Sequence, residues 1–360
     1  MRVCVCVKEG GYMKITKYEI DMLDVKAADA ILIHFYDDDS KKWKVVLIDA
    51  GTYESGKEVV DFVRNKYDTF YIDLAICTHC DDDHFGGFIY ILEQMRDYPK
   101  SCVDIRKLVI NDPGLHITQN DVKYFQKLEN VQAKARKVYT SHGVNLLELV
   151  YELQAQNRIS ASEGMSDGIS FFFEKSVEIL GPSKDYYKKK ALLFDNDMTP
   201  YDYDVDTDAD DAQLLPTSNL VYSKTLDQAG DDPSPSNQSS IILLFKPSDG
   251  KRYLFTGDAG VEAFTNFKYS SDIEQIKNVD WLKVPHHGSK KNLNNDLVNH
   301  LHPTVAYVST EKYRHYLSKA VVSALKKAGC DVYSTHVSGS LWHHEEIGGR
   351  TGEYSKASPL

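Results

Sequence analysis

The chain has 360 residues, of which 42% are hydrophobic and 26% charged, and its formal net charge is −11. This composition is typical of a soluble globular protein and excludes a coiled coil, a collagen-like repeat and wholesale disorder. No apolar run approaches the roughly 18 residues of a membrane-spanning helix, and the first residues lack the apolar core and cleavage site of a signal peptide, so we expect a cytoplasmic protein.

Short apolar runs alternate with helical patterns along the chain, which is typical of a layered α/β fold. Strands are predicted at residues 30–35, 45–51, 74–79, 107–112, 169–174, 177–182, 240–245, 253–258, 281–287 and 304–310. Amphipathic helices are predicted at residues 56–67, 86–97, 119–156 and 318–329. At about 150 residues per domain, the length fits two domains or one large α/β domain with insertions.

An aspartate-rich stretch at about residues 183–238 interrupts this pattern. Residues 191–235 hold eleven aspartates against the single Lys224, a local balance of −10. We interpret the stretch as a solvated surface insertion, because an EF-hand calcium loop would need a glycine at its sixth position and a glutamate at its twelfth, and the run has neither. Residues 281–330 carry the opposite balance, +6, and are the segment that could attract phosphate groups.

The cysteines show no spacing typical of a disulfide framework, so we expect reduced thiols. They are Cys4, Cys6, Cys77, Cys80, Cys102 and Cys330. Cys77 and Cys80 have the C-x-x-C spacing, but they flank a cluster of histidines and carboxylates and have no second pair, which disfavours a redox role. Cys80 is an alternative ligand for a soft metal ion.

The densest cluster of metal-binding residue types follows the strand predicted at residues 74–79. His79, Asp81, Asp82, Asp83 and His84 lie within six residues and precede a glycine pair that can open a helix. Adjacent carboxylates repel one another unless a cation holds them together. Mixed nitrogen and oxygen ligands favour zinc, manganese or iron over magnesium or calcium.

Two other predicted strands also end in side chains that can bind a metal ion. Asp258 ends the strand at 253–258, and His286 and His287 end the strand at 281–287. Because α/β proteins place their sites at the carboxyl ends of strands, we expect the three strand ends to form one site.

The segment T-H-x-D-x-D-H-x-G-G at residues 78–87 resembles the first motif of the metallo-β-lactamase superfamily, in the form typical of its ComEC-type branch, which is named for the hydrolase domain of bacterial DNA-uptake proteins. Further segments similar to that branch follow in order: LDVKAADAILI (23–33), VVLIDAG (45–51), ILGP (179–182), the residues 237–240 before SIILLF, LFTGDAG (254–260), LKVPHHGS (282–289) and residues 313–341. The resemblance covers about 320 residues. It implies a four-layer αββα sandwich that forms one domain over residues 1–360, with the insertion at about 183–238.

The resemblance also implies a cofactor of two divalent metal ions, zinc in the first place and manganese as the alternative. It assigns His79 and Asp81 to the first ion and Asp83 and His84 to the second, with Asp258 shared and either His287, which we favour, or His286 completing the second site. The two ions that share Asp258 would hold a reactive hydroxide between them, because metal coordination lowers the pKa of water from 15.7 toward about 7.

The sequence departs from the superfamily at the third motif, where many members have a histidine. No histidine occurs between His142 and His286, and Asn237 lies nearest to the expected place. The resemblance therefore predicts a weakly held first ion.

Residues beyond the metal cluster are assigned on the same resemblance. His315 matches a histidine of the branch, so we interpret it as a second catalytic residue beside Asp83. It would either donate a hydrogen bond to the substrate phosphate or act as general acid for the leaving group; the alternative is a solvent-facing residue at a helix start. Candidate substrate contacts are Lys290, Lys291, Arg314 and Asn237, and the alternative for the three basic residues is a solvated face.

For several other polar residues, a structural role is an alternative or is expected. Asp49 either orients a histidine ligand or occupies a turn, and Asp24 and Asp29 are expected to be structural. His336, His343 and His344 show no ligand spacing and are expected at the surface.

The sequence thus predicts a metal-dependent hydrolase, above all a phosphodiesterase or nuclease that acts on DNA, RNA or a nucleotide-derived small molecule. The alternatives are a hydrolase of another ester or thioester, since the fold alone does not fix the substrate, and a non-catalytic module with a degenerate first metal site. No membrane partner is expected.

Overall fold

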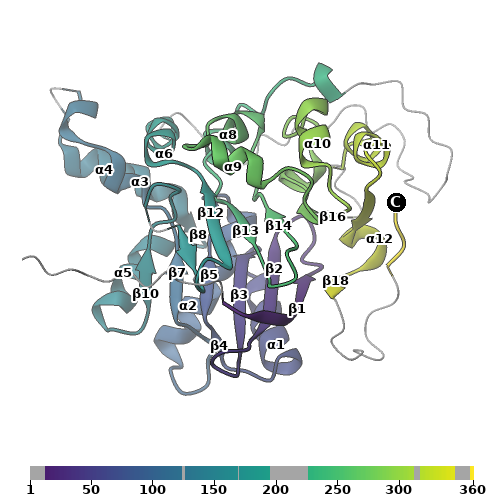
Figure 1. The fold of residues 1–360 in the computed structure, drawn as a ribbon. Helices are drawn as coiled ribbons and strands as arrows, with labels where there is room; N and C mark the ends of the chain where they lie inside the picture. Colours follow the sequence, from purple (N-terminus) through teal and green to yellow (C-terminus); the bar gives the residue numbers. More distant parts are fainter. Residues whose placement is uncertain (1–12, 124–125, 169, 195–225, 312–316, 345–356) are drawn as a thin grey trace, which may run out of the picture.

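The computed structural model describes residues 13–123, 126–168, 170–194, 226–311, 317–344 and 357–360, and these residues form two seven-stranded sheets with helices (Figure 1). The first sheet has the order β10 (Ser160–Ser162), β7 (Lys107–Val109), β5 (Leu74–Ile76), β3 (Lys42–Ala50), β2 (Ala30–Asp37), β1 (Ile15–Met22) and β18 (Leu341–His344). The second has the order β11 (Phe171–Phe172), β12 (Val177–Gly181), β13 (Ile242–Phe245), β14 (Tyr253–Phe255), β15 (Trp281–Lys283), β16 (Val305–Val308) and β17 (Asp331–Ser334). The predicted α/β class is confirmed.

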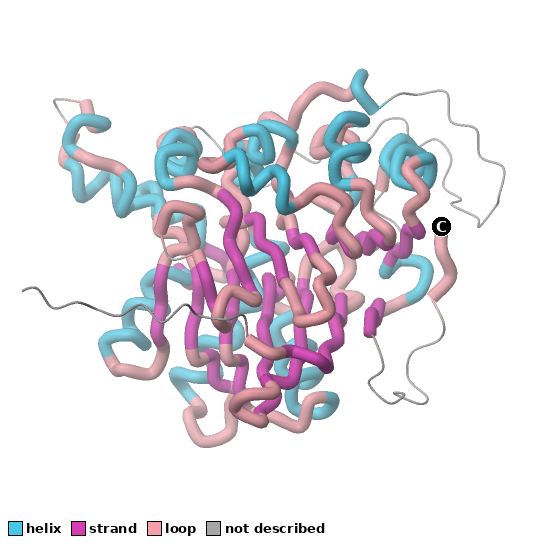
Figure 2. The backbone as a smooth tube through the Cα atoms, in the orientation of Figure 1, coloured by secondary structure: helices cyan, strands magenta, loops and turns pink. Residues whose placement is uncertain are grey.

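The two sheets pack face to face, and helices cover their outer faces (Figures 1 and 2). Successive residues of a strand point to opposite faces, so each strand contributes to two layers of the core. In β3, Val46 and Ile48 face the second sheet, while Val45 and Leu47 pack in the cluster formed with α1 (Ser55–Lys66), α2 (Asp82–Asp97) and α5 (Leu146–Ala155).

The second sheet repeats this arrangement on its own side. Leu243 and Phe245 of β13 face the first sheet, while Ile242 and Leu244 pack with α8 (Val261–Thr265), α10 (Asn295–Leu301) and α11 (Lys319–Lys327). Both sheets therefore bury their inner faces in one shared core. Shorter elements complete the described fold: α3 (Pro113–His116), α9 (Ser270–Gln275), α12 (Thr335–Ser338), and a small sheet of β4 (Tyr71–Ile72) and β6 (Asp104–Ile105).

The start of α2 differs from the prediction. The helix begins at Asp82 rather than after the glycine pair, so Asp83 and His84 lie in its first turn. The glycines instead allow close packing, because a Cβ on Gly87 would lie 2.0 Å from the carbonyl oxygen of Ala50. The end of β3 and the first turn of α2 are thereby pressed together.

The single helix predicted at residues 119–156 is wrong. The structure has η1 (Gln119–Asp121), α4 (Leu128–Arg136), η2 (Lys137–Tyr139), a hairpin of β8 (Thr140–Ser141) and β9 (Val144–Asn145), and then α5. The hairpin turns at His142 and Gly143, whose φ values of 52° and 77° are left-handed and do not continue a right-handed helix. Asn145 then caps α5 by accepting a hydrogen bond from the backbone N–H of Glu148.

Most of the predicted strands are shorter than expected, and the backbone explains where two of them end. β11 ends at Phe172 because Phe173, Glu174 and Lys175 have left-handed φ values that turn the chain. β15 ends at Lys283, since Pro285 has no N–H to donate and His286–Gly288 form the 3-10 turn η4. Strands β1, β10, β17 and β18 were not predicted.

The insertion is less solvated at its ends than the sequence suggested. Residues 195–225 lie outside the described residues, as do the strand position 169 and residues 312–316. At the insertion's start, α6 (Lys184–Ala191) buries Tyr186 and Tyr187, and at its end, after η3 (Leu226–Gln228), α7 (Pro235–Gln238) buries Asn237. The ends of the insertion are therefore part of the packed fold.

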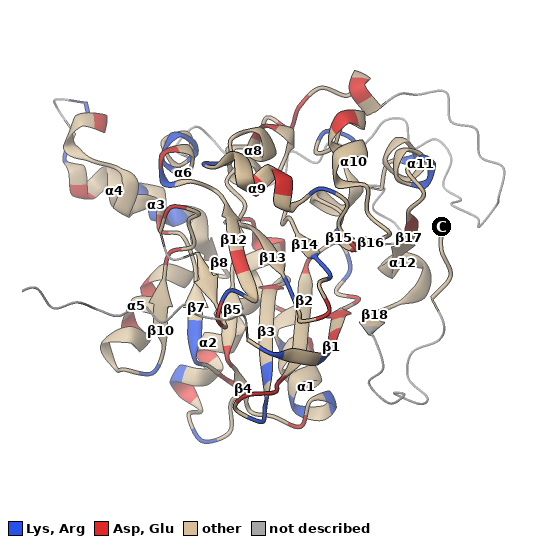
Figure 3. Ribbon diagram, in the orientation of Figure 1, with Lys and Arg blue, Asp and Glu red and all other residues tan. Residues whose placement is uncertain are grey.

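Positions of Lys and Arg lie intermixed with positions of Asp and Glu along the ribbon in the view of Figure 3. Within the basic segment 281–330, Lys283 is buried and cannot attract an external phosphate, and Arg314 lies outside the described residues. Among the helices that the structure describes, none is both long and apolar enough to cross a lipid bilayer.

Candidate metal centre

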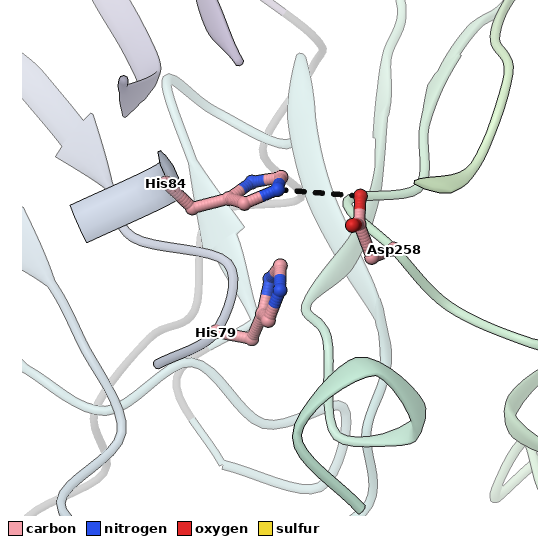
Figure 4. A group of neighbouring side chains, drawn as sticks. All are labelled: His79, His84 and Asp258. Atoms are coloured by element: carbon pink, nitrogen blue, oxygen red, sulfur yellow. Dashed lines mark ion pairs between the residues drawn. The ribbon is translucent and has the colours of Figure 1, made fainter. Parts of the chain in front are cut away.

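Three segments that are distant in the sequence bring their polar side chains together at the strand ends (Figure 4). His79 lies in the loop after β5, His84 in the first turn of α2, and Asp258 in the turn after β14. His84 Nε2 lies 3.4 Å from Asp258 Oδ1, and the rings of His79 and His84 are 4.1 Å apart between centroids. Figure 4 shows both imidazoles and the carboxylate pointing toward one space.

A glycine makes this approach between the two sheets possible. Gly257, directly before Asp258, has a left-handed φ of 50°, and a Cβ there would lie 2.8 Å from Thr78 Oγ1. Any larger side chain would push the β14 turn away from the loop after β5. The glycine therefore fixes the distance between Asp258 and the histidines.

The two remaining strand-end histidines also reach this cluster. His287 Nε2 lies 3.1 Å from Asp83 Oδ2 and 3.9 Å from Asp258 Oδ2, and His286 Nε2 lies 3.9 Å from Asp258 Oδ2. Asp81 joins it from the N-cap of α2, with Oδ2 3.5 Å from His79 Nε2. The structure thus brings together all seven residues that the sequence proposed as metal ligands: His79, Asp81, Asp83, His84, Asp258, His286 and His287.

Each central histidine is held through its Nδ1 atom by a fixed partner. His84 Nδ1 lies 2.8 Å from Asp49 Oδ2, and His79 Nδ1 lies 3.0 Å from Thr78 Oγ1. Asp49 also accepts hydrogen bonds from the backbone and side chain of Thr78 at 2.7 Å, so it orients both rings. On the other side of the cluster, His287 Nδ1 lies 3.0 Å from the carbonyl oxygen of Ser309. Holding Nδ1 directs Nε2 into the centre, as is usual for metal-binding histidines.

The remaining nitrogens fit a metal ion. Nε2 of His79 and Nε2 of His84 are buried, and neither has a hydrogen-bond partner among the described residues. A buried imidazole nitrogen without a partner is costly, and a divalent cation would satisfy both atoms. Three groups of side chains have ligand atoms close enough for one ion: His79, His84 and Asp258; Asp83, His84 and His287; and Asp29, Asp49 and His84.

The cluster is deeply buried on one side and open on the other. The side chains of His79 and His84 are fully buried, whereas those of Asp81 and Asp83 are 34% and 35% exposed. Solvent therefore reaches the carboxylates of Asp81 and Asp83.

Charges inside the cluster stabilise one another in the metal-free state. Burial opposes the charged form of His84, but Asp258, Asp83 and Asp49 outweigh it and hold the pKa of this imidazole well above its ordinary value. Burial likewise opposes the charge of Asp83, yet His84 and His287 hold its pKa below the usual range. The pKa of His286 is raised to about 9, because Asp258 and Asp232 outweigh the effect of burial. Without a metal ion, protonated imidazoles therefore balance these carboxylates.

Two buried residues lie beside the cluster: Lys283, which was not singled out from the sequence, and Asp29, which was expected to be structural. Lys283 Nζ lies 3.2 Å from Asp258 Oδ1, donates to the carbonyl oxygen of Gly257 at 2.8 Å, and is ion-paired with Asp29. Asp29 also accepts a hydrogen bond from Ser309, the residue that holds His287. Asp29 therefore supports the candidate metal centre through Lys283 and Ser309. The one sequence signal was a lysine inside the apolar run WLKVP.

A second missed residue, Asp232, lies behind His286. Its Oδ2 atom is 3.3 Å from His286 Nδ1 and accepts hydrogen bonds from Asn237 and Asn292 at 2.8 and 2.7 Å. Asn237, predicted as a substrate contact, is buried and packs against this group. Asp232 could not be singled out from the sequence, because residues 191–235 hold ten other aspartates.

Other residues singled out in the sequence have separate places. Cys80 Sγ contacts Ser236 Oγ at 3.1 Å. The pKa of this thiol is raised mainly because the group is buried. Asp82 faces the β8–β9 hairpin through Ser141. Lys290 and Lys291 are partly exposed and follow η4 directly, whereas Arg314 and His315 lie outside the described residues.

His343, which was expected at the surface, is only partly exposed. Its ring is partly buried and packs edge-on against Tyr253 at 5.6 Å and Tyr307 at 6.1 Å. β18 pairs with β1 at the edge of the first sheet, and this pairing places His343 over the inner face.

Comparison with known proteins gives one partial relationship. No protein-family model matches the chain. The chain is similar to ComE operon protein 3 of Bacillus subtilis (strain 168), with 28% identity over 130 residues, which are 36% of this chain and 16% of the relative. The match therefore covers only a small part of the relative's length and suggests a ComEC-like relationship.

Proposed function

We propose that the protein is a metal-dependent hydrolase, and specifically a phosphodiesterase or nuclease of the metallo-β-lactamase superfamily. The observation that carries the proposal is the convergence of four imidazoles and three carboxylates, with two buried Nε2 atoms that have no hydrogen-bond partner among the described residues. The order of motifs along the chain and the partial similarity to ComE operon protein 3 support the same branch. In this proposal residues 1–360 form one domain, with the insertion at about 183–238, and the core shared by both sheets supports it.

The donor set fits two divalent ions, zinc or manganese. His79 and Asp81 would hold one ion, Asp83, His84 and His287 the other, and Asp258 both. Such ions supply Lewis acidity and lower the pKa of water. The mixture of imidazole and carboxylate oxygen suits zinc and manganese better than calcium, which prefers oxygen alone.

The protein's own side chains contribute orientation and charge. Asp49 fixes His84 and, through Thr78, His79, so their Nε2 atoms need no rearrangement to bind. Such preorganisation is the main protein contribution to metal-assisted catalysis. Lys290 and Lys291 are partly exposed and come shortly after the histidine turn in the sequence, so their ammonium groups are candidates to contact a phosphodiester.

The substrate proposed is a phosphodiester: DNA, RNA or a nucleotide-derived small molecule. Paired divalent cations about 3.5–4 Å apart favour in-line displacement at phosphorus, since they stabilise both the attacking and the leaving oxygen. The intermixed positive and negative positions along the ribbon in Figure 3 do not favour a long polyanion over a small one. We therefore propose the bond type and leave both sizes of substrate as outcomes of the assay.

The test is hydrolysis of bis-p-nitrophenyl phosphate by protein loaded with zinc or manganese. We expect turnover by the wild-type protein and a loss to background in Asp83→Ala. The matched control is Asp97→Ala, because Asp97 is exposed at the opposite end of the same helix, and this variant should retain activity. Equal rates in wild type and Asp83→Ala would refute the phosphodiesterase proposal, and turnover of p-nitrophenyl acetate alone would favour the ester hydrolase alternative.

A further inference from the structure

The two consecutive histidines of η4 point to different parts of the centre. His286 and His287 both have left-handed backbone conformations, with φ values of 46° and 50°, and their ring centroids are 6.1 Å apart. His287 Nε2 approaches Asp83 at 3.1 Å. His286 Nε2 instead lies 3.9 Å from Asp258 Oδ2. Neighbours in sequence therefore need not serve the same ion.

Helix α7 links His286 to the side of the centre where Asp81 lies. Ser236 Oγ donates a hydrogen bond to Asp81 Oδ1. The next residue, Asn237, has its side-chain nitrogen 3.3 Å from His286 Nδ1. Two adjacent residues of one short helix thus touch Asp81 and His286, which places this histidine beside the His79 and Asp81 pair.

Asp232 holds His286 in the way that Asp49 holds His84. Its carboxylate is 3.3 Å from His286 Nδ1, while Asn237 and Asn292 donate to the same oxygen. The side chain of Asp232 is 5% exposed, and the ionisable group beside it is the imidazole of His286. A carboxylate behind Nδ1 orients the ring and leaves Nε2 to bind a metal ion.

We infer that His286, oriented by Asp232, is a further ligand of the ion held by His79, Asp81 and the shared Asp258, and takes the role of the absent third-motif histidine. This inference rests on the proposed metal centre and goes beyond it in one respect: the two histidines of η4 belong to different ions. In this arrangement the first site is complete despite the lack of a third-motif histidine. Asp232 is a positioning residue that the insertion contributes on its return to the fold.

The inference is tested by the metal content and the cobalt(II) absorption spectrum of four proteins: wild type, His286→Ala, His287→Ala and Asp232→Asn. We expect two ions per chain in wild type and one in each histidine variant, with different cobalt spectra because different sites are lost. Asp232→Asn keeps the side-chain shape and should weaken one ion about 10- to 100-fold, measured by chelator competition. His302→Asn, an exposed histidine with a φ of 36° that asparagine tolerates, is the control and should bind two ions.

The outcomes separate the two levels of the argument. Two ions in wild type with two ions of unchanged affinity in both His286→Ala and Asp232→Asn would overturn the inference and leave the proposed metal centre standing. Identical cobalt spectra in the two histidine variants would also overturn it, since both would then serve one ion. No ion in the wild type would overturn the metal centre itself. Far-ultraviolet circular dichroism identifies a variant that has lost its fold. If a histidine variant is unfolded, the metal affinity of the Asp232→Asn variant tests the inference instead.

Discussion

Lys283 lies 3.2 Å from Asp258 Oδ1 in the interior of the protein, where its ammonium group also pairs with Asp29. The side chains of all three residues are no more than 3% exposed. Burial opposes their charges, but the mutual attraction raises the pKa of Lys283 and lowers those of Asp29 and Asp258. The lysine is thus a fixed cation beneath the candidate metal centre.

Removing this cation should destabilise the fold. We expect Lys283→Met to lower the free energy of unfolding of the metal-free protein by about 3–5 kcal/mol, because it leaves two buried carboxylates without their partner. Urea denaturation measures the change. The double variant Lys283→Met with Asp29→Asn should be less destabilised than the single variant, because it restores the charge balance; equal stability of Lys283→Met and wild type would contradict the ion-pair account.

Asp49 should control metal affinity without affecting the backbone. Asp49→Asn keeps a residue type that tolerates its left-handed φ of 56° but removes the charge behind His84. We expect zinc affinity to fall about 10- to 100-fold in competition with a chromogenic chelator. Asp68→Asn is the matched control, since Asp68 is exposed and has a φ of 52°. The same affinity in both variants would show that Asp49 does not support the centre.

Gly87 should be intolerant of any side chain. Gly87→Ala places a Cβ 2.0 Å from the carbonyl oxygen of Ala50, so α2 must move away from β3. We expect a loss of about 1–3 kcal/mol in the free energy of unfolding, together with weaker metal binding, because His84 moves with the helix. Gly168→Ala is exposed, has no contact closer than 3.5 Å and should behave as wild type. A fully stable Gly87→Ala with normal metal content would refute this packing argument.

Metal binding should release protons. The pKa of His286 is raised to about 9 and that of His84 is raised as well, so at pH 7.5 the metal-free protein carries these imidazoles protonated. An imidazole must lose its extra proton to bind a metal ion, so the metal-free protein binds more protons than the metal-bound protein, and raising the pH favours binding. Affinity should therefore rise between about pH 6.5 and 9. Titration calorimetry at pH 7.5 in buffers of different ionisation enthalpy counts the protons, and a count of zero would contradict the assignment.

The layers of the fold and the convergence of the ligands could be predicted because they depend on local patterns. The buried strands begin with apolar runs, such as residues 45–48 and 74–77. Metal-binding side chains follow three strands, and the ends of these strands, which belong to both sheets, lie together. The hairpin within residues 119–156 was not predicted, because the left-handed conformation of His142 is set by its tertiary context and not by its type.

The supports of the site were harder to find than its ligands. Lys283, Asp29 and Asp232 act through contacts with residues far away in the sequence; Asp29 and Ser309, for example, are separated by 280 positions. A carboxylate in the acidic insertion has no local mark that distinguishes it from its neighbours. Charge pairs of this kind become visible only when the fold brings the segments together.

The measurement that tests the central claim most directly is a crystal structure of the manganese-loaded protein with anomalous diffraction collected at the manganese edge. The account predicts two anomalous peaks about 3.5–4 Å apart, both in contact with Asp258, with His84 at one and His79 at the other. Crystals loaded with manganese that show no peak among these side chains would contradict it.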